Sequence, residues 1–140
     1  MAAINPYLNF NGNTEEVFNF YRSVFGGEFL SVNRFKEMHA EDELAPGEGE
    51  RIMHISLPIG SSILMGSDTL QMWGNATPGN NFSISVSPAN EEEATHIFNG
   101  LAEGGQVTMP LGHAPWGAYF GMLTDKYGIA WMVNYEMSHS

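Results

Sequence analysis

One amphipathic helical pattern occurs twice in this sequence, at a constant separation. In residues 13–25 and 90–103 an asparagine opens the segment, a glutamate follows three positions later, and apolar residues recur at helical spacing before two glycines. Asn13 and Asn90 are 77 positions apart, and the same offset relates Glu16 to Glu93, Val17 to Ala94, Phe20 to Ile97, Tyr21 to Phe98, Val24 to Leu101 and Gly27 to Gly104. A chain of 140 residues has the length of one domain. We therefore expect a single domain, residues 1–140, built from two copies of one module.

The surroundings of the two predicted helices are also alike. An apolar strand precedes each helix, at residues 4–10 and 82–86, and three β-like runs follow it, at residues 28–35, 51–57 and 62–65, and again at 106–109, 118–123 and 129–135. Residues 58–61 are typical of a hairpin, and residues 72–80 of a linker. The order is βαβββ twice, with module one at about residues 1–70 and module two at about residues 80–137.

Two segments interrupt this pattern. Residues 36–50 carry six acidic side chains and are interpreted as a solvated loop, with a lid or a dimer contact as the alternatives. Residues 111–117, which include His113 and Trp116, are predicted to be irregular.

The charge and cysteine content exclude several classes of function. The net charge is −11, from 16 acidic and 5 basic residues, which is the wrong sign for a nucleic-acid or membrane partner. The absence of cysteine removes disulfides, thiolate nucleophiles and sulfur-ligated zinc. The first residues lack the features of a secretion signal, and no run approaches the roughly 20 apolar residues of a membrane span. We expect a cytoplasmic protein.

Five further segments are more specific than the helices. They are residues 5–13 (NPYLNFNGN), 20–27 (FYRSVFGG), 52–55 (IMHI), 64–68 (LMGSD) and 123–134 (LTDKYGIAWMVN). Together they resemble the PhnB-like proteins of the vicinal-oxygen-chelate superfamily, which contains glyoxalases, bleomycin-resistance proteins and dioxygenases. The resemblance covers nearly the whole chain. It implies an α+β fold in which two βαβββ modules form an open, cupped mixed sheet around a ligand cleft, and it implies a homodimer.

The resemblance also allows the metal site of the superfamily to be mapped. Metal-dependent relatives supply His or Glu ligands from four strand positions, which fall here on Pro6, on Asn81 or alternatively Ser83, on His54, and on Met132. Only His54 is a good ligand, because proline has no donor atom, an amide oxygen is weak for transition metals and a thioether prefers soft ions. We expect no metal and no other cofactor at these positions.

The cleft implied by the resemblance would be lined by His54, Asn81, Met132, Trp116, Phe120 and His113. His54 has two interpretations, as an imidazole that contacts the ligand or as a core histidine bonded to a neighbouring group. Trp131 is adjacent to Met132 and is expected on the opposite, core-facing side of the strand. Phe120 and Met122 share one strand face, but the pattern does not show whether that face points inward. The other histidines, His39, His96 and His139, are interpreted as surface residues.

Three classes of function remain. The first is a metal-independent protein that binds and sequesters a small organic ligand, in the manner of the bleomycin-resistance proteins. The second is a lyase, isomerase or dioxygenase with a displaced metal site, and the third is a protein-interaction module. The sequence favours the first, because the resemblance implies a concave site while three of the four ligand positions lack good ligands. Methyl transfer is not expected, because no glycine-rich strand–turn–helix for a methyl donor is found. No catalytic residue is identified.

Overall fold

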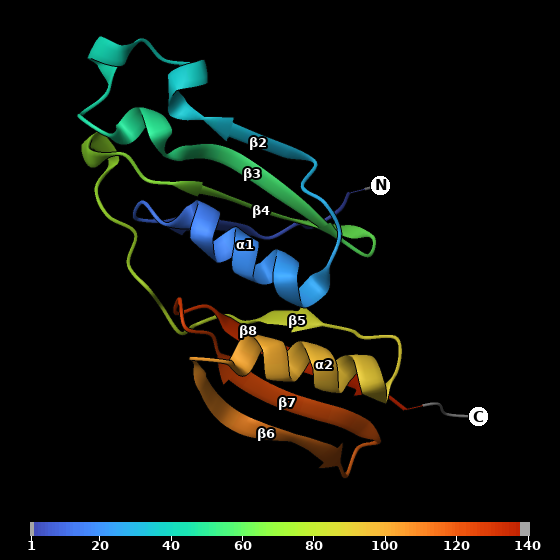
Figure 1. Ribbon diagram of the computed structural model, residues 1–140. Helices are drawn as coiled ribbons and strands as arrows, with labels where there is room; N and C mark the ends of the chain where they lie inside the picture. The colour runs from blue at the N-terminus through green and yellow to red at the C-terminus, as the bar shows by residue number, and fades with distance from the viewer. Residues whose placement is uncertain (1, 138–140) are drawn as a thin grey trace. The chain divides into compact units, whose positions relative to one another are not determined.

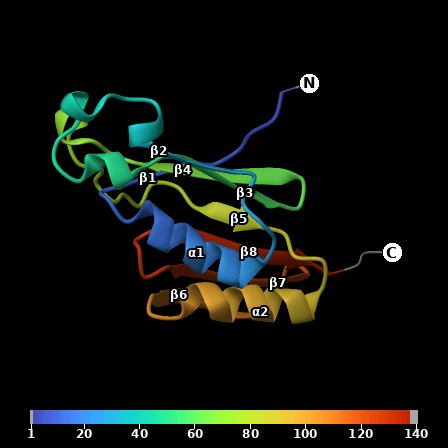
Figure 2. The ribbon, with the colours of Figure 1, turned by 45° about the horizontal axis from the view of Figure 1, so that its top comes forward.

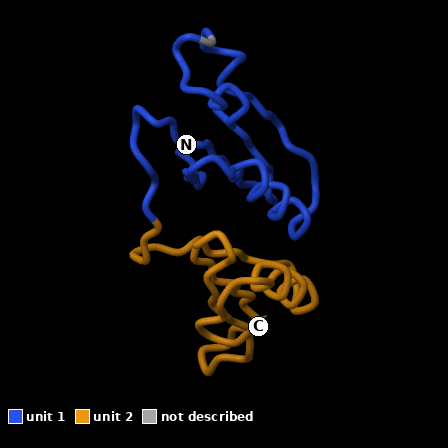
Figure 3. Tube along the Cα trace, turned by 60° about the vertical axis from the view of Figure 1, so that its left-hand side comes forward, with its two compact units in different colours: residues 1–77 blue, residues 78–140 orange. Residues whose placement is uncertain are grey.

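The computed structural model describes residues 2–137, and the chain divides into two compact units, residues 1–77 and 78–140 (Figure 3). The first unit contains β1 (Tyr7–Phe10), α1 (Thr14–Phe25), β2 (Ser31–Arg34), β3 (Ile52–Ile59) and β4 (Ser62–Asp68). The second contains β5 (Ile84–Val86), α2 (Glu91–Ala102), β6 (Gln106–Ala114), β7 (Ala118–Thr124) and β8 (Ala130–Glu136). Both predicted helices and all eight predicted strands are therefore present (Figure 1).

The two units have the same sheet topology. The strand order is β1-β4-β3-β2 in the first sheet and β5-β8-β7-β6 in the second. The first strand of each unit pairs in parallel with the last, and the remaining pairs are antiparallel. This confirms the predicted α+β class and the βαβββ order of each module, and it gives two four-stranded mixed sheets.

Each helix packs on one face of its own sheet (Figures 1 and 2). Tyr21 and Phe18 of α1 are completely buried, and a glycine at the centre of each sheet makes room for a helix aromatic ring. A Cβ atom at Gly66 would lie 2.6 Å from the Phe18 ring, and one at Gly121 would lie 2.6 Å from the Phe98 ring. Only glycine allows this approach, because real Cβ contacts are never so short.

The strand register separates the face of each sheet under its helix from the opposite face, which we call the open face. Paired residues share a face and successive residues alternate, so the glycines under the helices fix the assignment. The open face of the first sheet carries Tyr7, Asn9, Ser31, Asn33, His54, Ser56, Met65 and Ser67. The open face of the second carries Ser85, Met109, Phe120, Met122, Met132, Asn134 and Glu136.

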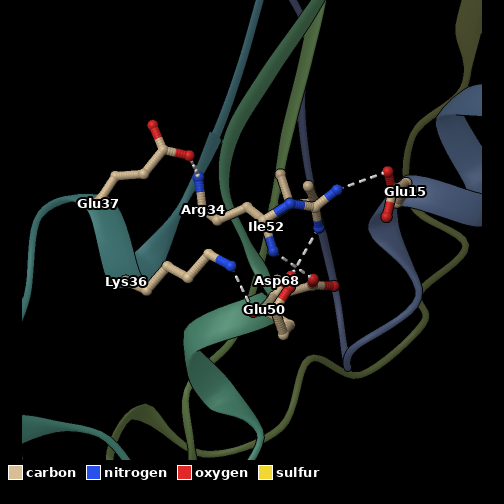
Figure 4. A network of polar contacts seen from close by, with 7 residues as sticks. All are labelled: Glu15, Arg34, Lys36, Glu37, Glu50, Ile52 and Asp68. Atoms are coloured by element: carbon tan, nitrogen blue, oxygen red, sulfur yellow. Dashed lines mark hydrogen bonds and ion pairs between the residues drawn. The ribbon is translucent and has the colours of Figure 1, made fainter. Parts of the chain in front are cut away.

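The start of α1 is stabilised by a distant carboxylate and not by its own cap residue. Asn13 occupies the N-cap position as predicted, but its side chain makes no capping hydrogen bond. Instead, Asp68 at the end of β4 accepts hydrogen bonds from the Gly12 and Thr14 amides at 3.0 and 2.9 Å and from the Thr14 hydroxyl at 2.6 Å. Its second oxygen accepts from the Ile52 amide at 2.8 Å (Figure 4). In α2 the expected cap does form, because the Glu93 amide donates a hydrogen bond to the Asn90 side-chain oxygen.

The two segments predicted to be irregular are partly ordered. Residues 36–50 contain three 3₁₀ turns, η1 (Phe35–Glu37), η2 (Glu41–Glu43) and η3 (Glu48–Glu50). Glu48 is not solvated, because the residue is 5% exposed and its carboxylate accepts hydrogen bonds from the Ala45 and Gln71 amides. These two hydrogen bonds hold the pKa of Glu48 below its ordinary value. Residues 111–114 belong to β6 and only residues 115–117 form a turn, because the strand continues to pair with β7 as far as Ala114.

The role of Asp68 gives a stability prediction. We expect Asp68→Asn to lower the free energy of unfolding by about 1–3 kcal/mol, because one carboxylate oxygen becomes an amide nitrogen that faces backbone donors. Urea denaturation measures the change. Asp42→Asn is the control, because Asp42 is exposed and should change stability by less than about 0.5 kcal/mol. Equal stability of the two variants would contradict the role given to Asp68.

Candidate functional site

The β6–β7 hairpin presents two aromatic side chains at one end of the second sheet. Residues 115–117 form a three-residue turn, in which Gly117 adopts φ +90°, a left-handed conformation that favours glycine. The Met137 amide donates to the Gly117 carbonyl at 3.0 Å, which ties the hairpin tip to the end of β8. The Trp116 ring packs edge-on against Phe120 on the open face, with centroids 5.8 Å apart. Trp116 remains 64% exposed.

Asn134 lies directly across from Phe120 on β8. Its Oδ1 atom is buried and has no hydrogen-bond partner among residues 2–137. A buried carbonyl oxygen without a donor is unfavourable, and such atoms are rare in folded proteins. Asn134 Oδ1 is therefore an unpaired acceptor beneath the open face, and an external donor reaches it only when the side chains that cover it move aside.

Methionine side chains continue the open face of the second sheet away from the hairpin. Met109 pairs with Met122, which pairs in turn with Met132, on three adjacent strands. Met132 faces away from α2, whereas Trp131 is 1% exposed and donates from Nε1 to Asp125, so the predicted core position of Trp131 is confirmed. Flexible thioether side chains fit ligands of different shapes.

His113 lies on the other face of the same sheet. It pairs with Tyr119, and their rings are 4.9 Å apart. Its Nε2 atom is 3.3 Å from a carboxylate oxygen of Glu91 on α2. His113 therefore faces the helix side, and the structure does not bring it together with Phe120 and Met132.

His54 lies on the open face of the first sheet, opposite Asn33. Its ring is 5.9 Å from that of Tyr7, and it is half-buried. No hydrogen bond to the imidazole occurs within the described part of the chain. The neighbouring polar groups bond to each other instead: Ser31 with Ser56 at 2.8 Å, and Ser67 with Asn9 at 3.2 Å.

The mapped metal positions are divided between the two units. Pro6 and His54 belong to the first unit, and Asn81 and Met132 belong to the second. Asn81 is exposed and precedes β5 by three residues. Because β1 and β5 begin 77 positions apart, as α1 and α2 do, the counterpart of Pro6 is the alternative residue Ser83. No three His, Cys, Asp or Glu side chains come together as a metal site among residues 2–137.

The basic residues of the first unit are engaged in pairs. Arg34 donates to Glu15 at 2.8 Å, which raises its pKa, and to the Glu50 carbonyl at 2.7 Å (Figure 4). Lys36 bonds to the Glu50 carboxylate at 2.6 Å and lowers the pKa of that group. The other two basic residues are also in contact with oxygen atoms: Arg22 lies 4.0 Å from Glu28, and Arg51 donates to the Thr69 carbonyl. Each basic side chain of this unit therefore has a carboxylate or carbonyl oxygen of the described chain beside it.

The remaining histidines do not gather at a site. His96 is exposed on α2, and His39 lies 3.8 Å from Glu43 in the acidic segment. His139 lies outside the described residues. Neither helix of the described chain is long and apolar enough to cross a membrane.

Asn134 and Glu136 were not predicted from the sequence as site residues. The available signal was strand alternation, because both residues lie on the same face of β8 as Met132.

Comparison with solved structures places the fold in the glyoxalase/bleomycin resistance/dioxygenase class. A glyoxalase-related enzyme from Fulvimarina pelagi shares 19% sequence identity and a TM-score of 0.63, over 96% of this chain and 88% of that chain. At this identity the likeness concerns the fold alone.

The family is defined by closer matches. The family model described as 3-demethylubiquinone-9 3-methyltransferase matches residues 2–134, and the chain belongs to this PhnB-like family. Protein PA1353 from Pseudomonas aeruginosa is 40% identical with a TM-score of 0.85, covering 99% of this chain and 100% of that chain. A PhnB protein from Bacillus cereus, described as a putative 3-demethylubiquinone-9 3-methyltransferase, is 31% identical with a TM-score of 0.76, covering 96% and 99%. Protein YjdN from Escherichia coli K12 is 31% identical, covering 94% of this chain and 93% of its own length.

The buried oxygen of Asn134 gives a prediction for the ligand-free protein. We expect Asn134→Leu to raise the free energy of unfolding by roughly 1–2 kcal/mol, because it replaces an unpaired buried acceptor with an apolar group of similar size. Asn9→Leu is the matched control on the other open face, where the amide oxygen accepts from Ser67; it should leave stability unchanged or lower it. A loss of stability in Asn134→Leu, measured by urea denaturation, would show that Oδ1 is satisfied in solution.

The isolated imidazole of His54 gives a second prediction. We expect His54→Gln to change the free energy of unfolding by less than about 0.5 kcal/mol, because no hydrogen bond within the described chain is lost. A core histidine bonded to a neighbour would instead lose about 1–3 kcal/mol. Ser56→Ala, which removes the bond to Ser31, is the positive control on the same face. Thermal unfolding of the three proteins separates the two interpretations of His54.

Proposed function

We propose that this protein binds a small organic molecule on the open face of the second sheet. The site consists of Trp116, Phe120, Met122, Met132 and Asn134, at and beside the β6–β7 hairpin. The buried Asn134 oxygen that lacks a donor within the described chain carries the proposal. A bound molecule with a hydrogen-bond donor would satisfy this atom and cover the side chains around it.

The chemistry of the surrounding residues supports this proposal. Aromatic rings and thioethers bury a large apolar area, while one placed polar group orients the ligand. The resemblance to the superfamily supports it as well, since it implies a ligand cleft enclosed by the cupped sheet. Sequestration of the bound molecule and homodimerisation are parts of the same proposal.

The site can be tested with a neutral aromatic probe, tryptophol, which has an indole ring and one hydroxyl donor. We expect calorimetric titration to show saturable binding that Trp116→Ser weakens about 3- to 10-fold, because an aromatic contact contributes about 0.5–1.5 kcal/mol. Trp73→Ser is the matched control. Trp73 is 60% exposed and packs on Phe35 in the first unit, and its loss should leave the affinity unchanged.

Amide NMR shifts during the same titration locate the bound probe. Changes confined to β6, β7 and β8 are the expected result. Changes centred on β3 and His54 would instead place the ligand on the open face of the first sheet. Equal weakening by both tryptophan variants would contradict the proposed site.

A further inference from the structure

The residues at the hairpin end of the second sheet define the chemical class of the ligand. We infer that this site selects an aromatic molecule that carries an ammonium group, and that Glu136 and Asn134 determine this specificity. The inference rests on the proposed function. Three independent features of the second unit support the inference.

The first feature is the polarity of the available hydrogen-bonding group. Asn134 belongs to the open face by strand alternation, and its buried Oδ1 atom lacks a hydrogen-bond donor within the described chain. An acceptor is satisfied only by an N–H or O–H group, and it repels the oxygen atoms of carboxylates and phosphonates. A ligand that bonds to Oδ1 must therefore bring a donor.

The second feature is the distribution of charge. Glu136 follows Asn134 by two residues and shares its face of β8; it is exposed and has no ion-pair or hydrogen-bond partner among the described residues. Glu91, Glu92 and Glu93 lie at the start of α2, on the helix side of the same hairpin end, where Thr95 contacts Tyr119 and Glu91 contacts His113. Residues 78–137 contain one basic side chain, Lys126. It lies in the β7–β8 turn, at the other end of these strands, roughly 20 Å away. The hairpin end is therefore negative, which favours a cationic ligand.

The third feature is the aromatic pair. Trp116 is exposed, and its ring packs edge-on against Phe120. Glu136 is near this pair, because it lies opposite Ala118 at the start of β7. Indole is the best side-chain partner for a cation over a ring face. An aromatic ammonium compound would stack its ring on this pair and direct its N–H groups to Asn134 and Glu136.

Three probes with the same ring separate charge from shape. Tryptamine carries an ammonium group, tryptophol a neutral hydroxyl and indole-3-acetate a carboxylate. At low salt we expect tryptamine to bind about 10-fold more tightly than tryptophol, from the exposed ion pair and the cation–π contact together, and indole-3-acetate to bind most weakly. The preference for tryptamine should shrink at high salt, because exposed charges are screened.

Two variants assign the specificity to residues. Glu136→Gln should weaken tryptamine about 3- to 5-fold and leave tryptophol unchanged. Glu103→Gln, which removes the same charge at the end of α2 on the helix side, should change neither affinity. Asn134→Leu should weaken both probes about 2- to 10-fold, because both donate a hydrogen bond, without loss of folding stability.

Each outcome is decisive. Equal binding of all three probes, or a preference for indole-3-acetate, would overturn the inference and leave the proposed site intact. Binding of none of the probes at millimolar concentration would overturn both. Sedimentation tests whether a second copy of the chain, and not a small molecule, covers this face. The second copy is the occupant if no probe binds and Trp116→Ser converts a dimer to a monomer.

Discussion

The carboxylate of Asp68 is the interaction on which the first unit depends most. It is 2% exposed and accepts four hydrogen bonds, from the turn before α1, from the first residue of that helix and from the first residue of β3. One side chain at the end of β4 therefore fixes the position of the helix relative to the sheet. The second unit uses Asp125 in a related way, where the carboxylate holds the β7–β8 turn and the Trp131 indole. Buried carboxylates are stable only when they are fully bonded, so these segments have little freedom to rearrange.

With the helix side fixed in this way, the two copies differ mainly on their open faces. Under the helices the units remain alike, with Gly66 against Phe18 and Gly121 against Phe98. On the open face of the first sheet, serine and asparagine side chains bond to one another around His54. The corresponding face of the second sheet has an apolar centre formed by Phe120, Met109, Met122 and Met132. Packing constrains only the residues under the helix, so a duplicated module keeps its core and can acquire a different chemistry on the other face.

The sequence predicted the elements well because both helices and most strands follow strong hydrophobic periods. It was less informative where one distant residue decides the outcome. Asn13 has the residue type of a helix cap, yet Asp68, 55 positions later, supplies the hydrogen bonds. Glu48 belongs to an acidic run with the composition of a solvated loop. It is nevertheless buried, and its carboxylate accepts hydrogen bonds from the Ala45 and Gln71 amides. The closeness of His113 to Trp116 in the sequence led to the prediction that both line one cleft. Strand alternation instead places the two side chains on opposite faces of the sheet. Local composition does not contain such long-range contacts.

The description of the family refers to methyl transfer. Nucleotide-like methyl donors are bound by backbone N–H groups at a glycine-containing turn before a helix, where those groups have no other partner. In this chain the turn at Gly12 has that form, but its amides already donate to Asp68. At the start of α2, the Glu93 amide already donates to the Asn90 side chain. Three glutamates in the first turn make this helix end negative, which disfavours a bound anion. At each helix start at least one backbone amide is therefore already bonded within the chain, and Arg34, Lys36 and Arg51 of the first unit donate to neighbouring oxygen atoms. The open face of the second sheet offers aromatic rings, thioethers, the Glu136 carboxylate and the Asn134 amide, and these groups suit the proposed ligand, a molecule that donates hydrogen bonds and carries apolar surface.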